Sequence, residues 1–95
     1  MTSLAGLRVL DLSRFIAGPY CAMMLGDMGA EVVKIEPPGE GEYARRAAPA
    51  VDGQSLYTFI VNRNKKSLAL DLRQAVGLAV LREMIARADV LVENF

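Results

Sequence analysis

Residues 9–19 read VLDLSRFIAGP, and they join an aliphatic run to a glycine–proline pair through a short polar segment. A run of aliphatic and β-branched residues is typical of a strand that is buried on both faces. The pair Gly18-Pro19 suits a helix start, because proline at the first helical position gives up no hydrogen bond that the helix needs. The stretch therefore predicts a strand whose carboxyl end leads into a helix, which is where ligands bind in open α/β sheets.

The rest of the chain continues this alternation of apolar runs and amphipathic segments. We expect strands at 7–12, 31–36, 67–72 and 90–93, helices at 20–28 and 74–88, and one or two helical turns within 54–61. Gly29 would end the first helix, and residues 37–53 would form a long loop of the kind that is usually a lid, a binding loop or a disordered segment. The second helix would bury an apolar face at helical spacing: Leu78, Leu81, Ile85 and Ala88. This order predicts an α/β fold, a Rossmann-like open parallel sheet with helices on both faces.

Composition excludes several classes of protein. The 95 residues make one domain at most, and 11 basic residues balance 11 acidic ones. We therefore expect no binding to nucleic acid or to an anionic membrane surface. Neither a run of about 18 apolar residues nor a signal-peptide pattern is present, so we expect a cytoplasmic protein without a membrane span.

The sequence contains no histidine and a single cysteine. These counts exclude a histidine-based catalytic triad within these residues and make us expect no metal site. Cys21 lies in an apolar helical stretch, so we expect its thiol to be buried and inert.

Acidic residues stand at or near the ends of the predicted strands: Asp11, Glu36, Asp71 and Glu93. Each is expected to cap a loop or a helix N-terminus at the carboxyl edge of the sheet. Glu36 follows Gly18 at about the distance of a ribose-binding carboxylate in a nicotinamide site. That alternative is weak, because the fingerprint needs three glycines and the sequence supplies one.

The strongest basic cluster is the run 62–67, which reads NRNKKS. A charge run of this kind is usually a solvated face. The alternative is a polyphosphate site at the sheet edge, to which Arg45, Arg46 and Arg73 would also contribute.

Several spaced blocks of the sequence resemble the N-terminal part of the family III coenzyme A transferases, a group that includes formyl-CoA:oxalate and crotonobetainyl/carnitine CoA-transferases. The similar blocks span residues 7–19, 25–36, 62–73 and 88–95. The resemblance implies an enzyme that moves coenzyme A from an acyl-CoA donor to a small carboxylic acid, through covalent intermediates on a carboxylate nucleophile. In the family that aspartate lies beyond position 95, so no catalytic residue is assigned here. The resemblance also implies an interlocked homodimer.

The same resemblance assigns residues that contact coenzyme A. Ile16 and Ala17 fall where formyl-CoA transferases have a Gln-Ala pair, and the isoleucine departs from that subgroup. Pro37 takes the place of an arginine that holds the nucleotide end, so that contact is lost or supplied elsewhere. The remaining family positions are matched by Leu70, Asp71, Leu72, Arg73, Asn94 and Phe95.

We interpret residues 1–95 as the N-terminal part of a coenzyme A-binding domain, and we expect this piece alone to be inactive and poorly stable because its sheet edges and helix faces would be bare. Two alternatives stay open. One is an α-methylacyl-CoA racemase of the same fold, and the other is a nonenzymatic nucleotide-binding half-domain.

Overall fold

The computed structural model describes residues 3–95, and its core is a four-stranded sheet. The sheet strands are β1 (Arg8–Asp11), β2 (Glu31–Glu36), β5 (Lys65–Ala69) and β6 (Val90–Val92). The helices are α1 (Ala17–Asp27), α2 (Leu56–Val61) and α3 (Ala75–Ala86), with a 3-10 turn η1 (Tyr43–Arg46) between β2 and α2. A small hairpin of β3 (Ala50–Val51) and β4 (Gln54–Ser55) precedes α2.

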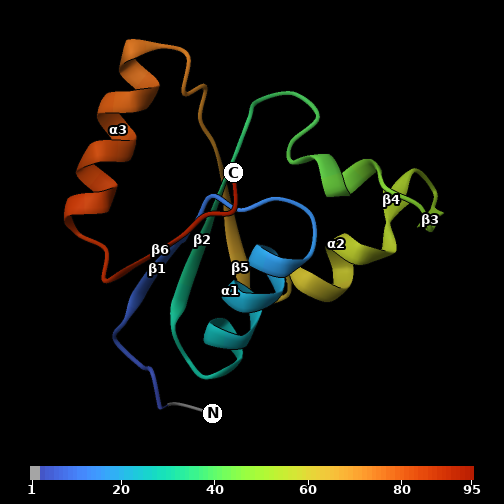
Figure 1. Ribbon diagram of the computed structural model, residues 1–95, viewed down its shortest axis with the longest axis horizontal. Coiled ribbons are helices and arrows are strands. Elements are labelled where there is room, and N and C mark those ends of the chain that lie inside the picture. Colours follow the sequence, from blue (N-terminus) through green and yellow to red (C-terminus); the bar gives the residue numbers. More distant parts are fainter. Residues whose placement is uncertain (1–2) are drawn as a thin grey trace.

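All four sheet strands run parallel in the order β5-β2-β1-β6. When the four sheet strands are counted in chain order, they lie side by side as third, second, first and fourth. This order is typical of a doubly wound sheet. The chain crosses back over the sheet between β5 and β6, so the direction of strand addition reverses between β1 and β6. In Figure 1, α3 lies on one side of the sheet, and α1 and α2 lie on the other. The predicted α/β class, with helices on both faces, is confirmed.

Alternation along the strands gives the sheet two apolar faces. Val9 and Val32 pack with Ala22 of α1, and Leu10 and Ile35 pack on the other face with Leu81 of α3. On the α1 face, however, the next inward residues along the two strands are Asp11 and Lys34, and both are buried. This face therefore changes from apolar to charged toward the carboxyl ends of the strands.

Two predicted segments shift in the structure. The strand expected at 67–72 is β5 at Lys65–Ala69, because its partner β2 ends at Glu36 and the following Pro37 has no N–H to continue the ladder. In α3 the buried positions are Gly77 and Leu81, whereas Leu78 and Ile85 are substantially exposed. The buried face is thus rotated from the predicted one.

The prediction that Cys21 is buried is wrong, because its thiol is exposed on α1. The residues that α1 turns inward are Gly18, Pro19, Ala22 and Met23, so Cys21 lies on the outer side of the helix. Gly29 does follow the end of α1, with φ of 105°, as predicted. No helix within residues 3–95 is long and apolar enough to cross a membrane.

Segment 37–53, predicted as a loop, contains more order than expected. It holds η1, and β3 and β4 are joined by Asp52-Gly53, both with positive φ. An Asp-Gly pair between two strands is the sequence signature of a hairpin with a two-residue turn, so the sequence alone contains a signal for this hairpin.

Candidate functional site

A cavity of about 420 Å³ opens at the carboxyl edge of the sheet. Each strand contributes residues at or beyond its carboxyl end: Leu12 from β1, Pro37 from β2, Leu70 from β5 and Phe95 from β6. Tyr43 of η1 forms a further part of the wall. This is the edge at which open parallel sheets bind ligands, beside the point where strand order reverses.

The structure brings five of the eight predicted site residues together around this cavity: Leu70, Asp71, Leu72, Arg73 and Phe95. Asn94 is outside the lining. Its side-chain oxygen accepts a hydrogen bond from the Arg14 N–H at 2.8 Å, and its amide group donates to the Arg14 carbonyl at 2.9 Å. Asn94 therefore fixes a residue of the cavity wall.

Ile16 and Ala17 also lie outside the lining, at the N-terminus of α1, and the Ile16 side chain is exposed. The next residue of α1, Gly18, packs closely against other parts of the protein. In the structure a Cβ on Gly18 would lie 2.1 Å from the Ser13 Cβ and 3.3 Å from the Asn94 Cγ. The close neighbours of Gly18 are thus other parts of the protein.

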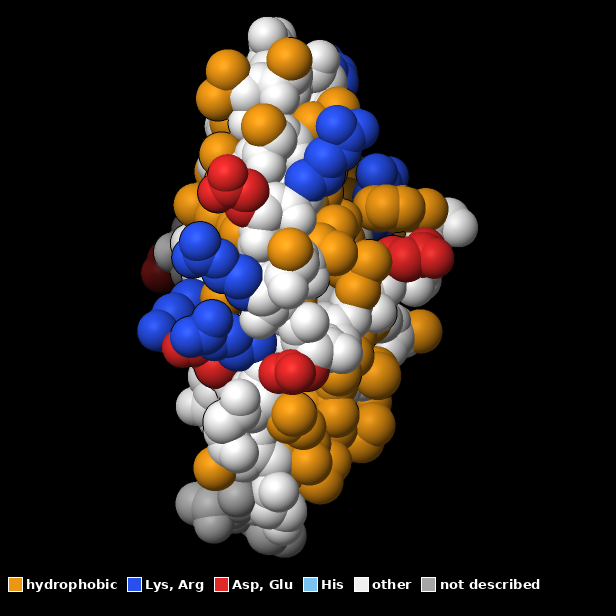
Figure 2. Space-filling model, turned by 90° about the vertical axis from the view of Figure 1, so that its left-hand side faces the viewer, with side chains coloured by type: hydrophobic (Ala, Val, Ile, Leu, Met, Phe, Trp, Pro, Cys, Tyr) orange, Lys and Arg blue, Asp and Glu red, His pale blue; other side chains and the backbone are white. Residues whose placement is uncertain are grey.

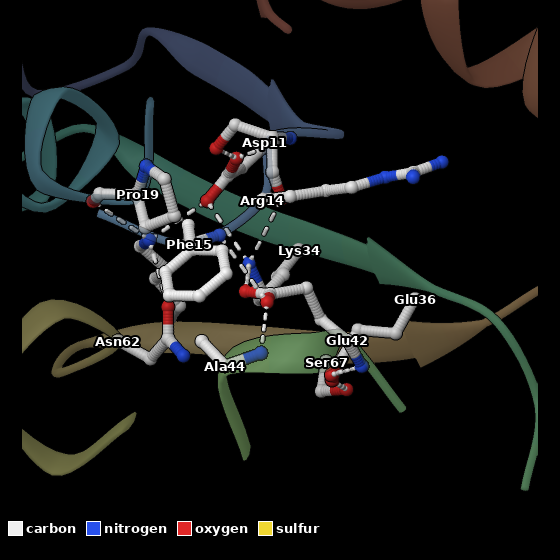
Figure 3. A network of polar contacts seen from close by, with 12 residues as sticks. Asp11, Arg14, Phe15, Pro19, Lys34, Glu36, Glu42, Ala44, Asn62 and Ser67 are labelled. Atoms are coloured by element: carbon white, nitrogen blue, oxygen red, sulfur yellow. Dashed lines mark hydrogen bonds and ion pairs between the residues drawn. The ribbon is translucent and has the colours of Figure 1, made fainter. Parts of the chain in front are cut away.

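A buried cluster of four charged side chains, Asp11, Lys34, Glu42 and Lys65, adjoins the cavity, and Glu42 is also part of its wall. Figure 3 labels Asp11, Lys34 and Glu42 of this cluster. Lys65 Nζ donates to Asp11 Oδ2 at 2.7 Å, and Lys34 Nζ lies 3.1 Å from Glu42 Oε1 and 3.8 Å from Asp11 Oδ2. The two positive and two negative charges balance inside the protein. Burying these charges is tolerable because each has an opposite partner.

This cluster ties together segments that are far apart in the sequence. Asp11 Oδ1 accepts from the backbone N–H and the hydroxyl of Ser13, which closes the turn after β1. Glu42 Oε2 accepts from the N–H of Phe15 and of Ala44. Phe15 has φ of 68°, a left-handed conformation that is unusual for a bulky residue. The cluster therefore holds the β1–α1 turn against the segment that follows β2.

The ionisation of Asp11 follows from these contacts. Burial by itself would raise the pKa of Asp11, but hydrogen bonds from Lys65 and Ser13 and the charges of Lys34 and Lys65 outweigh it, so the pKa is lowered. For Lys65 burial is the larger effect, and its pKa is lowered in spite of the bond to Asp11.

Glu36 forms a second ion pair beside the cavity, in which the carboxylate is buried and the Arg45 side chain is partly exposed. Its Oε1 accepts from the Arg45 Nε at 2.6 Å and from the Glu42 N–H at 2.9 Å, and its Oε2 accepts from the Arg45 Nη2 at 2.8 Å and from the Ser67 hydroxyl. Burial raises the pKa of Glu36, yet these hydrogen bonds and the Arg45 charge lower it to about 2. Both carboxylate oxygens are occupied, which leaves the ribose-binding alternative without support.

The acidic residues that end the strands act as loop caps, as predicted. Asp71 Oδ1 accepts from the N–H of Arg73 at 3.0 Å, and Glu93 Oε1 accepts from the N–H of Phe95 at 2.9 Å. Asp11 and Glu36 do the same for Ser13 and Glu42. These caps shape the turns from which the cavity is built.

The basic run 62–67 proves to be neither a single solvated face nor a free phosphate site. The Lys65 side chain is 2% exposed and paired with Asp11, whereas the next side chain, Lys66, is 74% exposed. Arg63 forms two hydrogen bonds with the carboxylate of Asp27. Strand alternation explains the contrast, because successive residues of β5 point to opposite faces.

Lys34 and Glu42 were not singled out from the sequence. A signal existed for Lys34, because a lysine within a buried strand requires a partner, and the parallel register places it directly opposite Asp11. In residues 3–95 no group of three or more His, Cys, Asp or Glu side chains is arranged to hold a metal ion.

Comparison with known proteins gives matches along almost the whole chain. The family described as CoA-transferase family III matches residues 4–95. The succinyl-CoA:glutarate CoA-transferase of Mus musculus is 47% identical over 96 residues, which cover 100% of this chain and 22% of that protein. The acetyl-CoA:oxalate CoA-transferase of Acetobacter aceti is 47% identical over 90 residues, 95% of this chain and 23% of that protein.

Comparison with solved structures also gives matches along almost the whole chain. The crystal structure of a CAIB/BAIF family protein from Brucella suis matches with a TM-score of 0.90 and 40% identity, over 99% of this chain and 26% of that one. A crystal structure of Rv3272 from Mycobacterium tuberculosis matches with a TM-score of 0.82 and 39% identity, over 95% of this chain and 26% of that one. The chain spans about a quarter of the length of these proteins.

Proposed function

Because the chain belongs to CoA-transferase family III, we propose that the protein moves coenzyme A from an acyl-CoA to a carboxylic acid, and that the cavity at the carboxyl edge forms part of the coenzyme A site. One observation carries this assignment. The cavity lies at the ligand-binding edge of a doubly wound sheet, and its wall contains five of the eight residues that the family resemblance assigns to coenzyme A.

Binding and orientation, not nucleophilic attack, are the roles we assign to these residues. In such a transfer, a carboxylate attacks the thioester carbonyl and the coenzyme A thiolate leaves. Asp11 cannot supply that carboxylate, because it is fully buried and both of its oxygens are hydrogen-bonded. Glu36 is excluded for the same reason.

The names of the relatives suggest the substrates to test. These proteins are named for succinyl-CoA or acetyl-CoA as donor, and for glutarate or oxalate as acceptor. We infer a short acyl-CoA donor and a small carboxylic acid acceptor for this protein as well. Relatives named as transferases also favour transfer over the racemase alternative.

Assembly as an interlocked homodimer in the cytoplasm is part of the proposal. It is supported by large apolar side chains left exposed on the helices: Phe59 and Ile60 on α2, and Val76, Val80 and Ile85 on α3. Figure 2 views the α3 side, where hydrophobic side chains lie at the surface among charged ones; their densest group is in the lower part of the view, below α3. Sedimentation equilibrium tests the dimer, and a monomer at micromolar concentration would contradict it.

The binding test is a calorimetric titration of the protein with coenzyme A and, separately, with NAD. We expect saturable binding of coenzyme A and none of NAD. Leu72→Trp, which adds a ring to the cavity wall, should weaken coenzyme A binding, whereas the control Arg82→Trp on the exposed side of α3 should not. Equal affinities for the two variants would contradict the assignment of the cavity.

Turnover is tested on a protein in which these residues are joined to the region that carries the family's nucleophilic aspartate, by incubating succinyl-CoA or acetyl-CoA with glutarate or oxalate and separating the thioesters by chromatography. A new thioester of the acceptor acid is the expected product. Coenzyme A binding without transfer to any acid of the panel would favour the nonenzymatic half-domain instead.

A further inference from the structure

The cavity carries three arginine side chains, Arg14, Arg46 and Arg73, and they differ in their partners. Arg46 Nη1 lies 2.9 Å from Glu40 Oε2, and Arg73 Nε lies 3.1 Å from Asp71 Oδ1. Arg14 forms no ion pair with a carboxylate of residues 3–95. Of the three guanidinium groups at this edge, it is the one whose charge is not already compensated.

The acidic residues of the cavity wall do not compensate the charge of Arg14 either. Glu36 is paired with Arg45, Glu42 with Lys34, and Asp71 with Arg73. The part of the lining that follows β2 begins with Pro37 and Pro38, which carry no charge. After these internal pairs are formed, the cavity retains one positive charge, and Arg14 carries it.

The position of Arg14 is fixed by its neighbours. Asn94 holds both its N–H and its carbonyl, and the Phe95 ring lies under the guanidinium at 4.9 Å from Cζ to the ring centroid. In Figure 3 the side chain extends away from the buried charged cluster over which its backbone lies. A guanidinium stacked on a ring keeps its N–H donors free at its edge, in the planar fork that suits phosphate oxygens.

We propose that Arg14 forms a phosphate subsite of the cavity, and that it binds either the 3′-phosphate or the diphosphate of coenzyme A. This inference rests on the proposed function, which supplies the ligand. It follows from the uncompensated charge, the anchored backbone and the stacked guanidinium at one wall of a cavity large enough for part of a nucleotide.

The test compares Arg14→Gln with Arg46→Gln and Arg73→Gln by calorimetry, with coenzyme A as the ligand. Arg14→Gln should weaken binding about tenfold, as expected for loss of a charge-assisted hydrogen bond. The two variants at paired arginines should lose less, because their charges are already engaged. Arg82→Gln, on the exposed surface of α3, is the control and should bind like the wild type.

A second ligand separates the two phosphate positions. If Arg14 binds the 3′-phosphate, 3′-dephospho-coenzyme A will bind the wild type and Arg14→Gln equally. If Arg14 binds the diphosphate, the variant will lose about tenfold with this ligand too. Either result supports a phosphate subsite.

The inference is overturned if Arg14→Gln binds coenzyme A as tightly as the wild type, or if it weakens the binding of pantetheine, which has no phosphate, by the same factor. The second result would mean that Arg14 acts only through the shape of the wall. A wild-type protein that binds no coenzyme A would instead refute the proposed function, and the subsite with it.

Discussion

Replacing Lys65 with methionine tests the buried charged cluster most sharply. Methionine keeps an unbranched apolar stem of similar length, so the change removes mainly the ammonium group. That group donates three hydrogen bonds, at 2.7 Å to Asp11 Oδ2, 3.0 Å to the Pro19 carbonyl and 3.0 Å to Asn62 Oδ1. Asp11 would be left with Lys34 Nζ at 3.8 Å as its nearest cation, which is too far for a hydrogen bond.

The expected loss of stability in Lys65→Met follows from the burial of the ion pair between Lys65 and Asp11. Removing one partner of a buried ion pair costs about 3–5 kcal/mol, because the remaining charge is left without compensation. The neighbouring Lys66 provides a matched control, since it is 74% exposed and pairs with the half-exposed Glu31 at 3.4 Å. Lys66→Met should cost less than about 1 kcal/mol, the usual upper limit for a surface pair.

Urea denaturation followed by circular dichroism measures both losses as free energies of unfolding. The lowered pKa of Asp11 adds a second readout, because the wild type loses the stabilisation as pH falls through the folded-state pKa. The Lys65→Met variant lacks most of this stabilisation. The difference in free energy of unfolding between the wild type and the variant should therefore become smaller in acid. Adding Asp11→Asn to Lys65→Met should recover part of the deficit at neutral pH. Equal costs for Lys65→Met and Lys66→Met would refute the reasoning.

Three further predictions concern single positions. Gly77→Ala should lower the free energy of unfolding by about 1–3 kcal/mol in urea denaturation, because the new Cβ would lie 2.1 Å from the Asp71 carbonyl oxygen; unchanged stability would contradict this contact. Gly29→Ala should cost about 1 kcal/mol in the same assay, since φ is 105° there, and a more stable variant would exclude that conformation. The lowered pKa of Glu36 stabilises the folded wild type at higher pH, and this stabilisation is lost between pH 4.5 and about 2. In Arg45→Met, the free energy of unfolding should therefore fall less over the same pH range than it does in the wild type. An unchanged acid profile would show that Arg45 does not set this pKa.

Local sequence patterns predict the framework of this fold well. The strand at 31–36 is found at the predicted bounds, and α1 ends before Gly29 as expected. These features depend on residues close in sequence, such as the proline pair after β2. The error in β5 has a different origin, because the end of that strand is set by where its partner β2 stops.

The candidate site could be predicted only in part. Positions 70–73 and 95 were reached through the family resemblance, and the structure places them around one cavity. The buried cluster was missed because it joins residues from four separate segments. Lys65 and Lys66 look equivalent in the sequence, and only the face each occupies in β5 makes one buried and the other exposed.

The most direct test of the central claim is to map coenzyme A on the protein by amide chemical shifts. If the cavity at the carboxyl edge is the site, saturating coenzyme A should shift the amides of residues 12–14, 36, 39–43 and 70–73. The smaller cavity of about 140 Å³ at the opposite end, lined by Arg8, Glu31 and Arg87, should show no change. Saturable shifts confined to that opposite end, or none at all, would contradict the account.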